Sequence, residues 1–89
     1  MLKIITANGD IVLLGAPTTI RCRGAGAAQR LRAYAYPAGM SDPATSVSID
    51  LAEGLEPWEC TELRRRLAER LRHGSNYIDM RALAEEVTG

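Results

Sequence analysis

The sequence predicts an α+β fold: a four- to five-stranded, mainly antiparallel β-meander, followed by two C-terminal helices packed on one of its faces. Apolar and polar residues alternate with a period of two in several short runs before residue 52. From residue 57 onward, apolar residues recur every three or four positions, as on one side of a helix. The 89 residues suffice for a single domain, with strands at about 2–51 and helices at about 57–73 and 76–87.

A hairpin is expected at the start of the chain. Two short apolar runs, at 2–7 and 10–14, contain β-branched residues and flank the dipeptide Asn8-Gly9. Asn-Gly is typical of a type I′ turn, in which both central residues need positive φ. Residues 11–14 are apolar at four consecutive positions, so this strand is expected to be covered on both faces.

Two further strands alternate more strictly, at 18–23 and 30–36, with a Gly-Ala-Gly run at 24–26 between them. Successive side chains of a strand point to opposite faces of a sheet. If the two strands pair, one face carries apolar or small residues and the other carries arginines and tyrosines. We call the second face the arginine–tyrosine face; it consists of Arg21, Arg23, Arg30, Arg32, Tyr34 and Tyr36.

A loop rich in proline and glycine follows. Residues 37–44 are the best candidate for a functional loop, because binding residues are often carried by such connections. Residues 45–51 then alternate once more and predict a half-buried strand, with Val47, Ile49 and Leu51 facing inward.

The first helix is predicted by its ends and by its apolar stripe. Pro57 fits the first helical position, and Gly74 fits the position just after the last turn. Trp58, in the first turn, is interpreted as a core residue. The stripe consists of Cys60, Leu63, Leu67 and Leu71.

The second helix is expected to start after Ser75 or Asn76, either of which can cap it, and to end at about Val87. Its expected buried residues are Tyr77, Met80, Leu83, Ala84 and Val87.

Charge is balanced in total but uneven along the chain. Eleven Lys or Arg residues match eleven Asp or Glu residues, so the formal net charge is 0. Residues 1–41 hold five basic residues against one acid, whereas residues 42–89 hold six arginines against ten acids. The acidic helical half could meet either a basic partner or the arginine–tyrosine face of a second copy. A homodimer is therefore one expectation.

No metal or cofactor is expected. Cys22 and Cys60 form no CxxC or Cys/His cluster, although a single bridge between them stays open. No run approaches the roughly 20 apolar residues of a membrane span, and the N-terminus lacks the apolar run of a signal peptide. We therefore expect a cytoplasmic protein with reduced thiols and no contact with a membrane.

The arginine–tyrosine face is the main candidate site. Arginine and tyrosine are typical anchors of protein interfaces. Cations interleaved with aromatic rings also suit single-stranded nucleic acid, and the same side chains can also be merely solvated. The net charge of 0 favours a protein partner, because dedicated nucleic-acid binders are usually basic.

The arginines of the first helix carry a weaker signal. Phosphate could be contacted by Arg64, Arg65, Arg66, Arg70 and Arg72, but glutamates share their surface. Glu62 stands four residues before Arg66, the orientation that stabilises an exposed helix. A solvated helix face is therefore the simpler interpretation.

No reaction is expected either. His73, the only histidine, lies at a helix C-terminus, which favours its cationic form without any catalytic role. Cys60 lies about 20 Å away along the helix axis, too far for a nucleophile–base pair. The sequence predicts a small non-catalytic protein–protein interaction module, such as a stoichiometric inhibitor or a phage-type accessory protein acting on a host defence complex. Nucleic-acid binding through the same face is the alternative.

Overall fold

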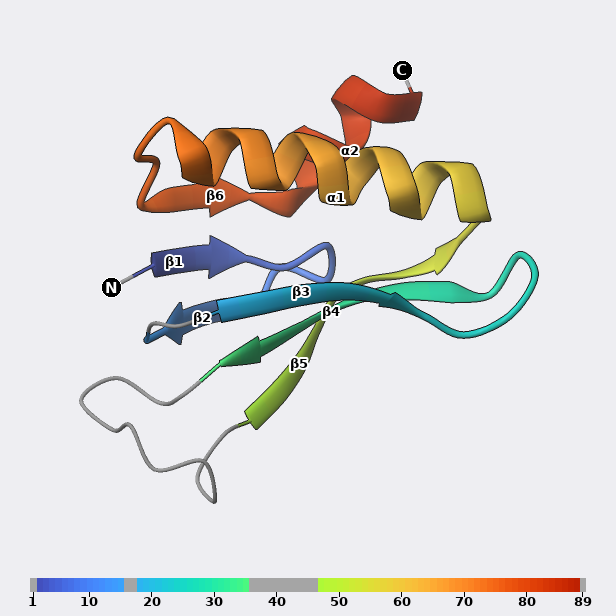
Figure 1. Cartoon of the computed structure of the whole chain (residues 1–89), viewed down its shortest axis with the longest axis horizontal. Helices are drawn as coiled ribbons and strands as arrows, with labels where there is room; N and C mark the ends of the chain where they lie inside the picture. Colours follow the sequence, from blue (N-terminus) through green and yellow to red (C-terminus); the bar gives the residue numbers. More distant parts are fainter. Residues whose placement is uncertain (1, 16–17, 36–46, 89) are drawn as a thin grey trace.

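The computed structural model describes residues 2–15, 18–35 and 47–88. Within these residues the six strands form two sheets of three strands each, in the orders β2-β1-β6 (the first sheet) and β3-β4-β5 (the second sheet). The mixed α+β class is confirmed, but the single meander is wrong, because only the second sheet is a meander. The elements are β1 Leu2–Ile5, β2 Ile11–Leu14, β3 Thr18–Arg23, β4 Gln29–Ala35, β5 Val47–Leu55, α1 Pro57–Arg72, β6 Tyr77–Asp79 and α2 Met80–Thr88 (Figure 1).

The first sheet joins the two ends of the described chain. β1 pairs antiparallel with β2 and parallel with β6, and Ile4 lies opposite Ile78. The helix predicted from residue 76 therefore begins as a strand, and α2 starts only at Met80. Periodicity cannot identify a strand of three residues. Ile78 is buried because it lies on the inward face of β6, beside the buried Ile4 of β1.

The first hairpin turns differently from the expectation. The amide of Gly9 donates to the carbonyl of Thr6, and Gly9 alone in this turn has positive φ, at 91°. Asn8 therefore does not take the conformation that a type I′ turn demands. A turn closed at Gly9 matches a three-residue loop with a glycine bulge. The buried Thr6 hydroxyl fixes it by accepting a hydrogen bond from the amide of Asp10.

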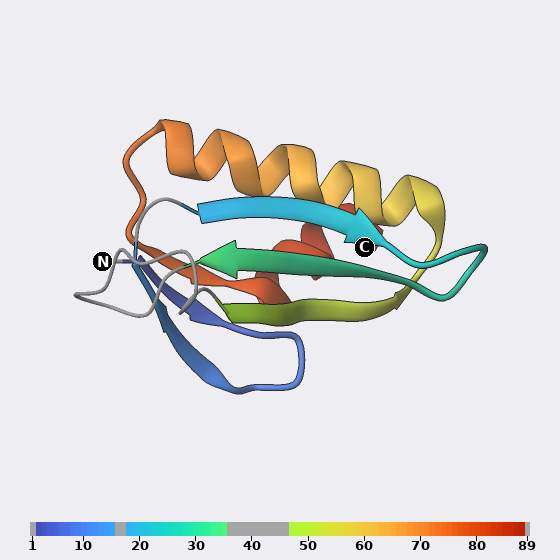
Figure 2. The same cartoon turned by 60° about the horizontal axis from the view of Figure 1, so that its bottom comes forward.

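The second sheet keeps the predicted alternation in β3 and β4. Leu31, Ala33 and Ala35 are buried, and the residues between them face outward. β5 runs to Leu55, four residues beyond the predicted end, with a bulge in its pairing to β4. Gly54, at φ 66°, supplies the left-handed conformation next to this irregularity. Figure 2 shows the three strands side by side, with α1 running along β3.

Several apolar side chains expected in the core are exposed. In β2, Ile11 and Leu13 are 65% and 53% exposed, so the outward face of the first sheet is open and that strand is not covered on both faces. Trp58 is 59% exposed and is not a core residue. Tyr77 is 53% exposed because it lies in β6 on the same outward face as Lys3.

Helix α1 has the expected ends and the expected stripe. At its start, Glu59 accepts a hydrogen bond from the amide of Glu56. At its end, the amides of Gly74 and Ser75 donate to the carbonyls of Leu71 and Arg70, the pattern of a Schellman motif. Of the stripe, Cys60, Leu63 and Leu67 are buried and Leu71 packs partly against the core.

Within 2–15, 18–35 and 47–88, no helix has the length and apolar character that a membrane span requires.

One apolar core lies between the sheets and the helices. Helix α1 contacts all three strands of the second sheet, and α2 contacts β1 and β6. The amide of Ala7 donates to the carbonyl of Leu51, so a hydrogen bond ties the first hairpin to β5. This arrangement leaves the outward face of the second sheet opposite to α1, where the arginine–tyrosine face lies.

Candidate functional site

The register of β3 and β4 builds the arginine–tyrosine face. Arg21 lies opposite Arg32, Arg23 lies opposite Arg30, and Tyr34 lies opposite Thr19. Cross-strand partners share a face of the sheet, so the four arginines and Tyr34 lie together as the sequence predicts. Tyr36 and the loop 37–44 fall outside the described residues.

Asp50 neutralises half of this face. Arg32 donates from Nε to Oδ1 of Asp50 at 2.8 Å, and Nη1 of Arg30 lies 3.5 Å from Oδ2. The hydrogen bond to Asp50 raises the pKa of the Arg32 guanidinium above its ordinary value. Sequence reasoning missed this carboxylate, although the alternation that turns Val47, Ile49 and Leu51 inward turns Asp50 outward. The β4–β5 register, which local patterns do not reveal, then places Asp50 opposite Arg32.

Arg23 is held by a tyrosine instead of a carboxylate. Its Nε donates to the hydroxyl of Tyr34 at 3.0 Å, and its guanidinium carbon lies 5.7 Å from the centre of the Tyr34 ring. The hydrogen bond from Arg23 lowers the pKa of Tyr34, with burial opposing the shift. The ring therefore has a cation over one of its faces, and its hydroxyl is engaged.

The β3 side of the face remains cationic. Thr19, Arg21, Arg23 and Tyr34 line a shallow depression of about 250 Å³. In the part of the chain that the structure describes, no carboxylate forms an ion pair with Arg21 or Arg23. An anionic group in this depression would meet two guanidinium groups and two hydroxyl-bearing side chains.

Three arginines of α1, Arg65, Arg66 and Arg70, pair with glutamates within the helical layer. Glu62 accepts from Arg65 at 2.6 Å and from Arg66 at 3.0 Å, as the spacing of Glu62 and Arg66 predicts. These two hydrogen bonds lower the pKa of Glu62 to about 2. Arg70 pairs with Glu86 of α2 at 2.7 Å. The expectation of a solvated, internally balanced helix face is confirmed for these arginines.

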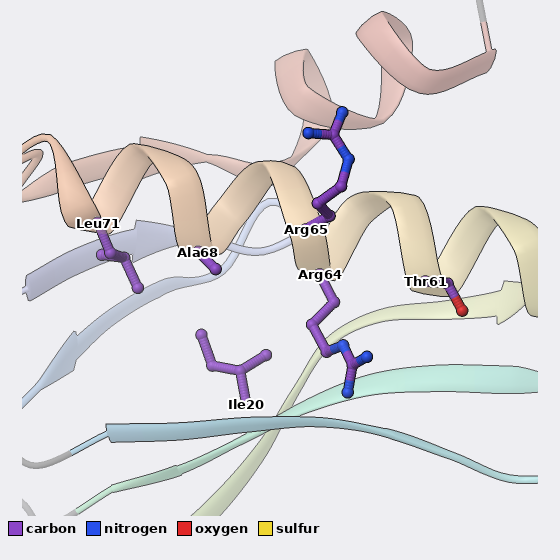
Figure 3. A pocket seen from close by; sticks show the side chains of 6 residues that line it. All are labelled: Ile20, Thr61, Arg64, Arg65, Ala68 and Leu71. Carbon is purple, nitrogen blue, oxygen red and sulfur yellow. The ribbon is translucent and has the colours of Figure 1, made fainter.

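Arg64 is the exception in the triplet. None of the ion pairs between described residues includes it. Its side chain extends from α1 toward β3, above a groove of about 570 Å³ that runs between the helix and the strand (Figure 3). The groove is lined by Ile20, Thr61, Arg64, Arg65, Ala68 and Leu71.

The two cysteines are both free, and their thiols interact. Burial and a hydrogen bond with Cys22 raise the pKa of the Cys60 thiol to about 12. A thiol with such a pKa is protonated at neutral pH and is not an activated nucleophile. His73 is exposed at the C-terminal cap of α1. Among residues 2–15, 18–35 and 47–88, no cluster of three His, Cys, Asp or Glu side chains could hold a metal ion.

Four arginines of the second sheet and α1 form no ion pair with a described carboxylate: Arg21 and Arg23 on the outward face, Arg64 over the groove, and Arg72 in the last turn of α1. The remaining arginines of the second sheet and of α1 are largely paired. Comparison with protein-family models, with curated proteins and with solved structures finds no match to this chain.

Proposed function

We propose that this chain is a small, non-catalytic protein-binding module that holds an acidic protein partner on the arginine–tyrosine face. The observation that carries the proposal is the uneven neutralisation of this face. Asp50 pairs with Arg30 and Arg32, whereas Arg21 and Arg23 line an open depression without a carboxylate among the described residues. Arginine and tyrosine at such a position are the residue types that most often anchor protein interfaces.

Nucleic acid is the alternative occupant of the same face. Single-stranded nucleic acid needs open aromatic surfaces on which its bases stack. Tyr34 is half-buried, Arg23 lies over its ring, and its hydroxyl already accepts a hydrogen bond. These contacts favour a protein partner over a nucleic acid.

Two matched double variants test the proposal. Arg21→Ala with Arg23→Ala removes two charges from the arginine–tyrosine face, and Arg66→Ala with Arg70→Ala removes two charges from α1. Each protein is used to capture partners from a lysate of the organism that encodes it, and is titrated with single- and double-stranded oligonucleotides at low and high salt. We expect the first variant to lose the captured protein and the second to keep it.

Two outcomes would contradict this assignment. Retention of the captured partner by both double variants would mean that the arginine–tyrosine face is not the binding surface. Tight oligonucleotide binding that weakens steeply with salt, and that is lost with Arg21 and Arg23, would establish the nucleic-acid alternative instead.

A further inference from the structure

Strand β3 is an open edge of the second sheet. Among the described residues it pairs with β4 alone, so one side of its backbone offers N–H and C=O groups without a partner in the sheet. Edge strands are usually short, covered, or interrupted, because their free backbone groups recruit further strands. β3 has six residues, and none of the described positive-φ residues and no described bulge interrupts it.

The groove beside this edge has the shape that an added strand requires. Ile20 of β3 forms its floor, and Ala68 and Leu71 of α1 form its apolar wall (Figure 3). A strand paired to β3 lies about 4.8 Å from it and directs every second side chain to the inner side of the sheet. Those side chains would enter the groove, whose volume of about 570 Å³ is within the usual range for binding pockets.

Charge determines what kind of strand fits. The outward side chains of an added strand lie next to Arg21 and Arg23, whereas its inward side chains lie next to Ile20 and Leu71. Acidic residues are favoured at the outward positions and apolar residues at the inward positions. Arg64, over the groove, favours one further carboxylate on the inner side. The edge therefore selects an extended segment in which acidic and apolar residues alternate.

A second copy of this chain fits the edge less well. Antiparallel pairing of β3 with its own copy would place Arg21 and Arg23 of one copy against the same residues of the other. Like charges directly opposite each other destabilise a sheet. The edge is thus unsuited to self-pairing and suited to an acidic chain.

We propose that the free edge of β3 and the groove beside α1 bind an extended, alternating acidic–apolar segment of the partner by β-strand addition. In this mode, backbone hydrogen bonds supply affinity, and alternate side chains supply specificity. The inference rests on the proposed function and deepens it, because it states that the acidic partner binds as an extended strand.

The test uses two synthetic seven-residue peptides with the same composition. In one, glutamate alternates with valine; in the other, the glutamates and valines form separate blocks. Amide hydrogen exchange and NMR chemical shifts of the full chain are measured with each peptide. We expect the alternating peptide to protect every second amide of β3 and to bind at least about tenfold more tightly than the block peptide.

A variant pair tests the groove itself. Ala68→Glu places a negative charge in the groove, and Ala82→Glu makes the same change at an exposed site of α2. We expect Ala68→Glu to weaken the alternating peptide about tenfold or more and Ala82→Glu to leave it unchanged. Both residues are exposed, so neither change disturbs the core.

The outcomes separate this inference from the proposed function. Equal binding of both peptides, without protection of β3, would overturn strand addition while leaving an electrostatic protein-binding face intact. Binding of the alternating peptide that survives loss of Arg21 and Arg23, with β3 protected, would support the edge and contradict the arginine–tyrosine face. Failure of both peptides to bind, or pairing of β3 with a second copy in solution, would overturn the inference.

Discussion

The outer surface of α1 and the arginine–tyrosine face are both rich in arginine, yet they differ in where the carboxylates that pair with the arginines come from. On α1, Arg65 and Arg66 find Glu62 within four residues of the same helix. On the sheet, Arg32 finds Asp50 only because β5 returns beside β4. Arginine content alone therefore does not identify a binding surface. The positions at which no acid lies near an arginine are more informative, and on the sheet these are Arg21 and Arg23 of β3.

The largest expected effect comes from a substitution in the core beneath α1, which lies between the two arginine-rich surfaces. Leu67 is fully buried in the α1 stripe. Leu67→Ala should cost about 2–5 kcal/mol of unfolding free energy, because it leaves a cavity beneath the helix. Arg72→Ala, on the exposed side of α1, should change it by less than about 0.5 kcal/mol. Urea titration measures both values, and a small loss for Leu67→Ala would mean that α1 is not part of the core.

Asp50 is expected to weaken the binding of acidic chains to the arginine–tyrosine face. Asp50→Asn removes the carboxylate shared by Arg30 and Arg32, which should raise the affinity of the alternating peptide by about two- to fivefold at low salt. Asp10→Asn removes the same charge from the exposed turn of the first hairpin and should have no such effect. Titration calorimetry at two salt concentrations measures the change. An unchanged or lower affinity for Asp50→Asn would show that Asp50 does not limit the positive field of this face.

The ion pairs of Glu62 on α1 predict that the stability of the fold depends on pH. The pKa of Glu62 is about 2 in the folded chain, below its ordinary value of 4.5, so its charged form is favoured by folding. This contribution is present above about pH 4.5 and is lost as the pH falls toward 2. Glu62→Gln should therefore show a smaller fall in melting temperature than the wild type between pH 5 and pH 2.

The matched control for this pH dependence is Glu85→Gln, an exposed position of α2 for which no ion pair is found among the described residues. It should keep the pH profile of the wild type. Identical profiles for Glu62→Gln and Glu85→Gln would mean that the Glu62 pairs do not form in solution.

The smallest expected effect is spectroscopic. The hydrogen bond from Arg23 lowers the pKa of Tyr34 below 10. Arg23→Ala should return this pKa toward 10, whereas Arg30→Ala should leave it unchanged because Arg30 makes its contact with Asp50. The ¹³C signal of the Tyr34 ring, followed through an alkaline titration, reports the value directly. Equal pKa values in the wild type and in Arg23→Ala would show that the Arg23–Tyr34 contact is not populated.

Local patterns in the sequence were sufficient for much of this structure. Alternation placed Arg21 and Arg32 on one face, and helical spacing paired Glu62 with Arg66, because both rules act within a single element or ribbon. Long-range contacts were not accessible in this way. Residues 77–79 form a strand only because β1 accepts them, and Asp50 reaches Arg32 only through the register of β5.

The parallel pairing of β1 with β6 also has a consequence for how the chain folds. During synthesis β1 emerges before its partner Tyr77–Asp79, and the whole second sheet and α1 lie between them in the chain. Closing so long a loop is slow, since the ordering entropy is lost before the contact is gained. Until that moment one edge of β1 lacks its neighbour, and Ile4 lacks the apolar contact of Ile78. This edge of β1 is therefore exposed to wrong pairing until Tyr77–Asp79 joins it.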